Sequence, residues 1–77
     1  MKTHIQIKLF ATLQQFTPDS ADNFAIEAGT TVQGLLDKLD IPAAKARLIF
    51  IDGIKADLNQ TLNGGERVGI FPPVGGG

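Results

Sequence analysis

The chain has 77 residues, a formal net charge of −1 and no cysteine, so it is long enough for one domain and too short for two. Its 7 basic and 8 acidic residues form no basic stripe for nucleic acid, and the missing thiols exclude disulfides, thiolate metal sites and cysteine nucleophiles. A single histidine leaves no cluster for a metal, and no apolar run reaches the about 18 residues of a membrane span. No signal-peptide pattern opens the sequence, and we expect a cytoplasmic protein.

The first third of the chain predicts two strands with a long connection. Apolar and polar residues alternate from Ile5 to Leu9, which places three aliphatic side chains on one face of a strand. A shorter alternation runs from Phe24 to Ala28 and ends at Gly29. Together these segments predict an N-terminal hairpin.

A helix is predicted after the hairpin. Thr30, followed three residues later by Gln33, is a capping-box pattern that satisfies free amides at a helix start. Pro42 disfavours helical geometry at Ile41, so the helix should end near Asp40. The residues that recur at helical spacing and form one apolar stripe are Val32, Leu35, Leu36 and Leu39.

The second half of the chain predicts further strands and two turns. Asp52-Gly53 suits the positive φ angles of a two-residue hairpin turn, and Asn63 to Glu66 predicts another turn. The expected strands are 48–51, 54–56 and 68–71.

This order predicts an α+β domain, a β-grasp in which one main helix covers one face of a mixed sheet of four to five strands. A ferredoxin-like fold is disfavoured because a second full-length helix is hard to place in residues 43–47. The domain should span residues 1–71, and residues 72–77 should form an extended, flexible tail. The expected core is Leu9, Ile26, Leu35, Leu36, Leu39, Ile49, Ile51, Val68 and Ile70. Core packing and partner docking are equally compatible with Phe10, Phe50 and Phe71.

The tail has the most distinctive pattern. Pro72 and Pro73 cannot extend a central ladder or a helix, so they should direct the chain away from the sheet. Extended, the six residues to Gly77 span roughly 20 Å, enough to reach into a partner's pocket. Gly75 and Gly76 lack Cβ atoms, so they can thread a narrow channel and leave the Gly77 carboxylate unhindered. A frayed terminus or leftover linker is the alternative interpretation of glycines alone.

Residues 71–77 read Phe-Pro-Pro-Val-Gly-Gly-Gly and resemble the F-P-P-V-x-G-G signature of the molybdopterin synthase small subunit, within the MoaD/ThiS family of ubiquitin-like sulfur carriers. Weaker similarity covers the whole chain, including Asp52-Gly53 at the hairpin turn. Gly64 stands where that family often has Asp, and Asp52 stands where Asn is frequent. Both departures lie in expected turns.

The resemblance implies a ubiquitin-like β-grasp whose Gly77 is adenylated by an E1-like enzyme using ATP and then thiocarboxylated through a sulfur donor system. Sulfur would pass to a pterin precursor held by a molybdopterin synthase large subunit. The chain itself would bind no cofactor and no metal, and it would not be an enzyme alone. Partner contacts are implied at Phe71, Pro72, Pro73 and Val74.

Three other functions remain open. A relative of the same family would deliver sulfur for thiazole or tRNA thiolation, although the F-P-P-V segment speaks against this. A ubiquitin-like modifier would form isopeptide bonds through Gly77. A structural adaptor would bind through its sheet alone. A patch for an acidic partner surface is the alternative interpretation of four basic residues, for which ordinary solvated charge is favoured; they are Lys45, Arg47, Lys55 and Arg67.

Overall fold

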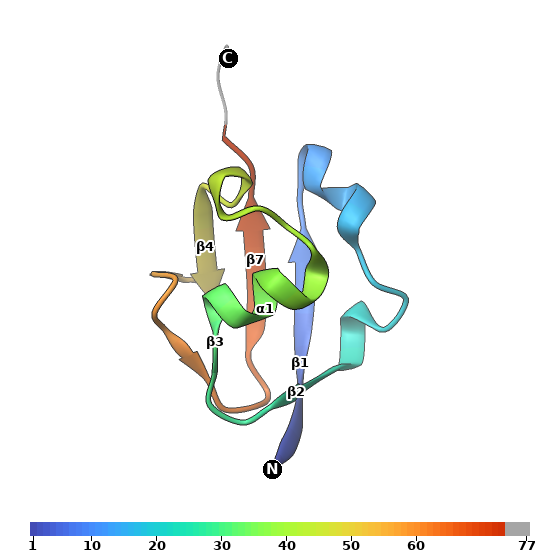
Figure 1. Ribbon diagram of the computed structural model, residues 1–77, viewed down its shortest axis with the longest axis vertical. Coiled ribbons are helices and arrows are strands. Elements are labelled where there is room, and N and C mark those ends of the chain that lie inside the picture. Colours follow the sequence, from blue (N-terminus) through green and yellow to red (C-terminus); the bar gives the residue numbers. More distant parts are fainter. Residues whose placement is uncertain (74–77) are drawn as a thin grey trace.

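Strands β1 (Lys2–Leu9) and β7 (Arg67–Phe71) run parallel in the middle of a five-stranded sheet. The computed structural model describes residues 1–73, and Figure 1 shows the arrangement of its elements. Strand β2 (Phe24–Glu27) pairs antiparallel with β1 at one edge. On the other side β4 (Leu48–Ile51) pairs antiparallel with β7, and β5 (Ile54–Ala56) follows at the second edge. The predicted mixed sheet is confirmed, with five strands.

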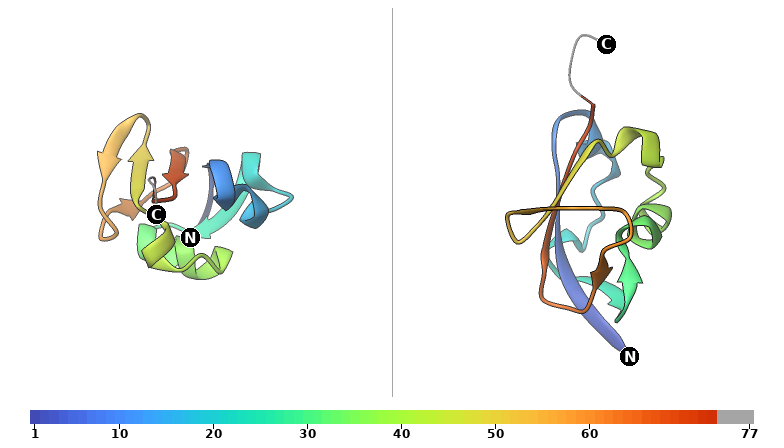
Figure 2. Two further views of the ribbon diagram at one scale, coloured as in Figure 1. Left: turned by 90° about the horizontal axis from the view of Figure 1, so that it is seen from above. Right: turned by 90° about the vertical axis from the view of Figure 1, so that its left-hand side faces the viewer.

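One main helix, α1 (Val32–Leu39), covers one face of this sheet, as Figure 2 shows. The 3₁₀ helices η1 (Ala11–Phe16) and η2 (Ala21–Asn23) occupy the connection from β1 to β2. The stretch in which no second long helix could be placed holds only η3 (Ala43–Lys45). The β-grasp prediction is therefore confirmed.

A small second sheet was not predicted. It consists of β3 (Thr30–Thr31) and β6 (Thr61–Leu62), which pair antiparallel. The backbone of residues 58–60 continues the contact, since Val32 N donates to Gln60 O and Gln33 N donates to Leu58 O. These bonds occupy amides at the start of the helix and tie it to a distant loop.

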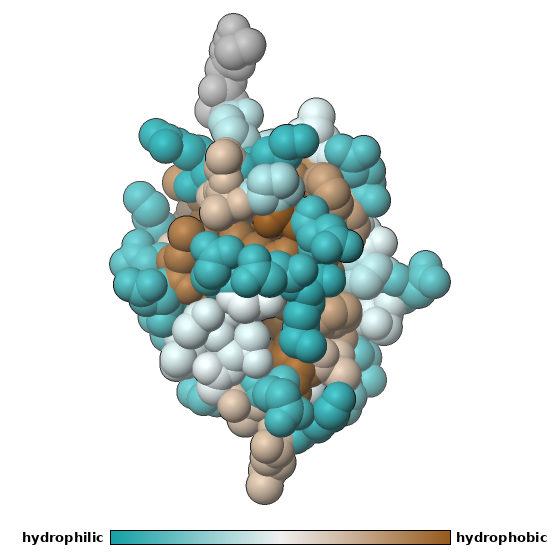
Figure 3. Space-filling model, viewed as in Figure 1, coloured by the Kyte–Doolittle hydropathy of each residue, from teal (hydrophilic) through white to brown (hydrophobic). Residues whose placement is uncertain are grey.

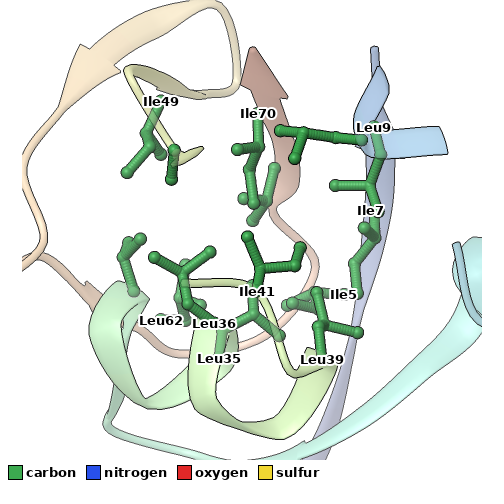
Figure 4. Close-up of a cluster of buried hydrophobic side chains, with 14 of the residues drawn as sticks. Ile5, Ile7, Leu9, Leu35, Leu36, Leu39, Ile41, Ile49, Leu62 and Ile70 are labelled. Carbon is green, nitrogen blue, oxygen red and sulfur yellow. The ribbon is translucent and has the colours of Figure 1, made fainter. Parts of the chain in front are cut away.

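The core lies between the sheet and α1, where side chains from both layers point toward one another (Figure 4). Alternation places Ile5, Ile7 and Leu9 on the face toward the helix, and the predicted helical stripe is fully buried. The predicted core is confirmed except for Ile51, which is only half-buried. Leu13 and Leu62 are also fully buried, although they belong neither to the predicted core nor to the apolar faces predicted for the first strand and the helix. Leu13 is carried inward by η1, and Leu62 by the small second sheet.

The helix begins one residue later than the capping-box pattern suggests. Thr31 is the N-cap, and its hydroxyl accepts a hydrogen bond from Gly34 N at 3.1 Å. The hydroxyl of Thr30 instead donates to Glu27 O. Both threonines pair with β6, and Thr31 is the cap because it directly precedes Val32, the first residue of the helix. The predicted end is confirmed, because Asp40 is the C-cap in left-handed geometry, with φ of 60°.

The predicted Asp52-Gly53 turn is confirmed, with φ angles of 53° and 83°. Its aspartate also reaches another strand. Asp52 Oδ1 accepts from Arg67 N at 3.0 Å, and Asp52 N donates to Arg67 O at 2.9 Å. The hairpin turn is thereby fastened to the first residue of β7.

The helix side of the molecule has a polar surface. Figure 3 shows hydrophilic side chains across the middle of this side, and Asp37 and Lys38 of α1 are both exposed. Within residues 1–73 no helix is long and apolar enough to cross a membrane.

Candidate functional site

The C-terminal end of β7 is held from both sides. Because β1 and β7 are parallel, their C-terminal ends lie at the same end of the sheet, where Leu9 pairs with Ile70. Beyond that pair, Phe10 N donates to Ile70 O at 3.2 Å, and on the other flank Arg47 N donates to Phe71 O at 2.9 Å. The position of Phe71 is thus set by backbone hydrogen bonds to two different segments.

Three phenylalanines gather at this end. The rings of Phe10 and Phe71 are stacked, with centroids 4.1 Å apart and 1° between their planes. Phe50 meets Phe71 edge-on, at 5.7 Å and 85°. All three rings are half-buried. Alternation along β4 and β7 places Phe50 and Phe71 on the face opposite the helix, because Ile49 and Ile70 point into the core.

These rings border a groove on the helix-free face. Its volume is about 530 Å³. Gly69 contributes no side chain, so the floor of the groove stays open opposite Phe50, its partner in the β4–β7 ladder. A Cβ on Gly69 would lie 3.5 Å from Phe10 Cε2. The residues that define this sheet groove are Lys8, Phe10, Phe50, Arg67, Gly69 and Phe71.

The charge on this face differs from that of the whole protein. Strand residues that alternate with the core positions include four of the seven basic residues and one of the eight acidic ones. One further carboxylate, that of Asp22 in η2, also lines the groove. Among residues 1–73 the one ion pair joins the N-terminal amine to Glu27, at 3.8 Å. The basic strand residues on this face are Lys2, Lys8, Lys55 and Arg67.

The basic residues singled out from the sequence as a possible patch lie on different elements. Lys55 and Arg67 are strand residues of the helix-free face, whereas Lys45 belongs to η3 on the connection after the helix. Lys8, which was not considered, lines the groove with Arg67. Alternation could have identified Lys8, since it lies between the core positions Ile7 and Leu9.

The predicted partner contacts begin at this site. Phe71 is the last residue of β7 and a wall of the sheet groove. Pro72 is buried and Pro73 is exposed. The other predicted site residues lie outside the described part of the protein; they are Val74, Gly75, Gly76 and Gly77.

Sequence reasoning missed the groove as a unit. The sequence left two alternatives for Phe10 and Phe50, packing in the core or docking a partner, and it gave Gly69 no role. The available signal was position: Gly69 lies between the core residues Val68 and Ile70, so it must face the other side of the sheet. The described residues contain no group of three or more His, Cys, Asp or Glu that could hold a metal ion.

Comparison with known proteins gives the family. The ThiS family model matches residues 7–77. Small archaeal modifier protein 1 of Haloferax volcanii is 25% identical, with a TM-score of 0.67 and coverage of 94% of this sequence and 99% of that one. The sequence matches none of the curated proteins with which it was compared.

Two further solved structures share the fold. A Pyrococcus furiosus protein described as a putative subunit 1 of a molybdopterin converting factor is 24% identical, with a TM-score of 0.64 and coverage of 94% and 99%. The complex of subunits 1 and 2 of the molybdopterin-converting factor from Helicobacter pylori includes a polypeptide that is 23% identical, with a TM-score of 0.55 and full coverage of both sequences. With a family model that spans nearly all of its length and a β-grasp fold shared with these structures, the protein belongs to the ThiS family.

Proposed function

We propose that the protein is a sulfur carrier that donates sulfur in molybdopterin biosynthesis and is not an enzyme on its own. The observation that carries this proposal is the place of Phe71. This residue is both a wall of the sheet groove and the last strand residue before the tail that ends in Gly77. A partner that covers the groove is therefore in position to receive the tail.

The chemistry at Gly77 needs two steps. In the first, the Gly77 carboxylate attacks the α-phosphorus of ATP on an E1-like enzyme, pyrophosphate leaves, and an acyl adenylate forms. In the second, hydrosulfide from the donor system attacks the acyl carbon, the bond to the phosphate oxygen breaks and AMP leaves, which yields the thiocarboxylate. Gly75 and Gly76 suit this role because residues without Cβ atoms fit a narrow channel in the partner. Since activation consumes ATP, the proposal places the carrier in the cytoplasm.

The partner is proposed to dock on the sheet groove. An apolar side chain of the partner would lie on the floor at Gly69, between Phe50 and the stacked pair of Phe10 and Phe71. Carboxylates of the partner would face Lys8 and Arg67, for which residues 1–73 provide no ion-pair partner. Continuity with the tail and charge complementarity both support an acidic, apolar partner surface.

Both partners of the pathway are proposed to use this face. The Helicobacter pylori structure pairs subunit 1 with subunit 2, which supports a large catalytic subunit as the recipient of the loaded tail. Phe71, Pro72, Pro73 and Val74 would contact it. The activating enzyme must reach the same carboxylate, so the two partners should bind one after the other.

A second candidate function is protein modification. The similarity to a small archaeal modifier protein, at 25% identity, supports an isopeptide bond between Gly77 and a lysine of another protein. Membership of the ThiS family equally leaves sulfur delivery for thiazole or tRNA thiolation as an alternative acceptor pathway. Modification requires the same adenylate, but an amine rather than sulfur then attacks it.

The deciding experiment is intact-protein mass spectrometry after incubation with ATP, an activating enzyme and a sulfur donor. We expect one terminal oxygen to be replaced by sulfur in the full-length protein and not after deletion of Gly76 and Gly77. Circular dichroism should show the same fold for both. The sulfur proposal would be refuted if the mass stayed unchanged with an activating enzyme that is shown to act on another carrier. Conjugates of higher mass that require Gly77 would favour the modifier function.

A further inference from the structure

The turn between β6 and β7 contains an exposed asparagine followed by glycine, Asn63-Gly64. One carboxylate holds both of their amides. Glu66 Oε2 accepts from Asn63 N at 2.8 Å, and Glu66 Oε1 accepts from Gly64 N at 2.7 Å. The next amide is fixed as well, since Gly65 N donates to His4 O at 2.7 Å. The backbone of this turn is thus held at three successive residues.

Gly64 has no room to be any other residue. Its φ is +123°, and a Cβ there would overlap the hydroxyl of Thr3. Only glycine fits this position. The same lack of a side group makes Gly64 N an unhindered nucleophile for the asparagine amide that precedes it. The turn therefore requires a glycine directly after Asn63, and an asparagine followed by glycine is the arrangement that closes this ring most readily.

We propose that Asn63 is a deamidation site and that the Glu66 carboxylate keeps it intact. In the reaction Gly64 N loses its proton to solvent base and attacks Asn63 Cγ, the bond between Cγ and Nδ2 breaks, and ammonia leaves. The resulting five-membered succinimide then takes up one water and opens to aspartate or isoaspartate. One water is consumed and one ammonia is released, with no change in oxidation state.

Glu66 opposes this reaction in two ways. The hydrogen bond at Gly64 N holds the proton that must leave, and the negative carboxylate beside it disfavours an amide anion. The second bond, at Asn63 N, resists the backbone rotation that brings Gly64 N onto Cγ. Ring closure must therefore wait until the turn opens and both bonds are lost.

Aspartate or isoaspartate at residue 63 would disturb the turn that leads into β7. Either acid would add negative charge next to Glu66, and isoaspartate would also lengthen the backbone by one carbon just before β7. That strand ends at Phe71, the wall of the sheet groove. A carrier that is consumed and regenerated many times needs a turn that outlasts many cycles, and the Glu66 contacts would set this lifetime.

The test compares rates of deamidation at neutral pH by peptide mapping, with mass spectrometry of the peptide that contains residue 63. We expect Glu66→Ala to deamidate roughly tenfold faster than the unchanged protein, because losing charged hydrogen bonds lowers the barrier to opening. Glu66→Gln, which keeps an acceptor but loses the charge, should fall between them. Asn23 and Asn59 are not followed by glycine and serve as internal controls.

A second variant separates local opening from general loss of stability. Asp52→Ala removes a side-chain hydrogen bond to the backbone at the other turn, at Arg67 N, and should leave the rate at Asn63 unchanged. An equal acceleration in Asp52→Ala would overturn the proposal by showing that global unfolding controls the reaction. An unchanged or slower rate in Glu66→Ala would also overturn it, the slower rate by making Glu66 a base that assists ring closure.

Discussion

The rings of Phe10 and Phe71 lie parallel, with their centroids 4.1 Å apart, although 60 residues lie between them in the sequence. The parallel ladder of β1 and β7 creates this contact, because both strands end at the same edge of the sheet. The stack forms one wall of the sheet groove, and Phe71 passes directly into the tail. Under the proposed function, partner docking and tail delivery would be linked through this single residue.

Replacing Phe10 should weaken partner binding more than it weakens the fold. Phe10→Ala removes a half-buried ring, so we expect a loss of about 2 kcal/mol in the free energy of unfolding, below the cost of emptying a full core site. Urea unfolding measures the stability, and calorimetric titration with an activating enzyme measures the affinity. Phe16→Ala is the control, because Phe16 packs against the core and not into the groove. Equal affinities for the two variants would argue against docking at the groove.

Charge reversal on the groove face should slow association. We expect the Lys8→Glu, Arg67→Glu double variant to bind an acidic partner about tenfold more slowly at low salt, with the difference shrinking as salt is added. Stopped-flow kinetics at several ionic strengths measures this effect. Lys38→Glu, on the exposed side of α1, provides the matched control. A partner indifferent to the first change, or equally sensitive to the second, would contradict the proposed complementarity.

Filling the groove floor should affect binding without harming the fold. Gly69→Ala places a Cβ at an ordinary contact distance of 3.5 Å from the Phe10 ring. Because the strand loses a flexible residue, the free energy of unfolding should stay the same or rise by about 0.5 kcal/mol. Affinity for the partner should fall about tenfold, since the methyl occupies the space of the inserted side group. Thermal unfolding measures the stability of the variant, and titration calorimetry measures its affinity for the partner. An undiminished affinity would mean that the partner does not bind at the floor of the sheet groove.

The two neighbouring threonines should differ in their effect on stability. Thr31→Ala removes the N-cap acceptor of Gly34 N and should cost about 1 kcal/mol of the free energy of unfolding. Thr30→Ala leaves that cap in place and removes a hydroxyl that donates to Glu27 O near the surface, so it should cost less. Chemical denaturation of both variants ranks them. The reverse order would restore Thr30 as the cap.

The turn glycines should also rank in a fixed order. Gly53→Ala meets nothing within 4 Å but sits at φ of +83°, so it should cost about 1 kcal/mol from backbone strain alone. Gly64→Ala adds overlap with Thr3 to a similar strain, so we expect a loss of about 3 kcal/mol or more. Denaturant titrations measure both losses. Similar values would mean that the backbone near Thr3 yields easily.

Local patterns were enough to predict most of the fold. The helical stripe from Val32 to Leu39, the alternation of β1 and the Asp52-Gly53 turn each depend on neighbours in sequence, and each was predicted correctly. The helix start was misplaced by one residue because two adjacent threonines offer a capping hydroxyl, and the hydroxyl of Thr30 donates to Glu27 O while that of Thr31 caps the helix. Leu13 and Leu62 were missed because a 3₁₀ helix and a two-residue strand leave no periodic pattern.

The candidate site has one part that a local pattern indicates, the tail, and one part that depends on distant contacts, the sheet groove. The tail is a contiguous motif that the sequence displays directly, and its role and that of Phe71 in binding a partner stay predictions. The sheet groove combines residues from β1, β4 and β7, whose side-by-side order no short-range pattern reveals. The alternation of side chains along each strand could have placed Lys8, Phe50 and Gly69 on the helix-free face, but only the order of the strands in the sheet brings them together.

The way β7 is held has a mechanical consequence. Hydrogen-bonded ladders to β1 and β4 run along both of its sides, and the amides of Phe10 and Arg47 add bonds at its C-terminal end. A force applied along the strand at the C-terminal end of β7 therefore loads these bonds together in shear instead of breaking them one at a time. Under the proposed function, such an anchor would let the tail be withdrawn from a partner's pocket while the domain keeps its shape.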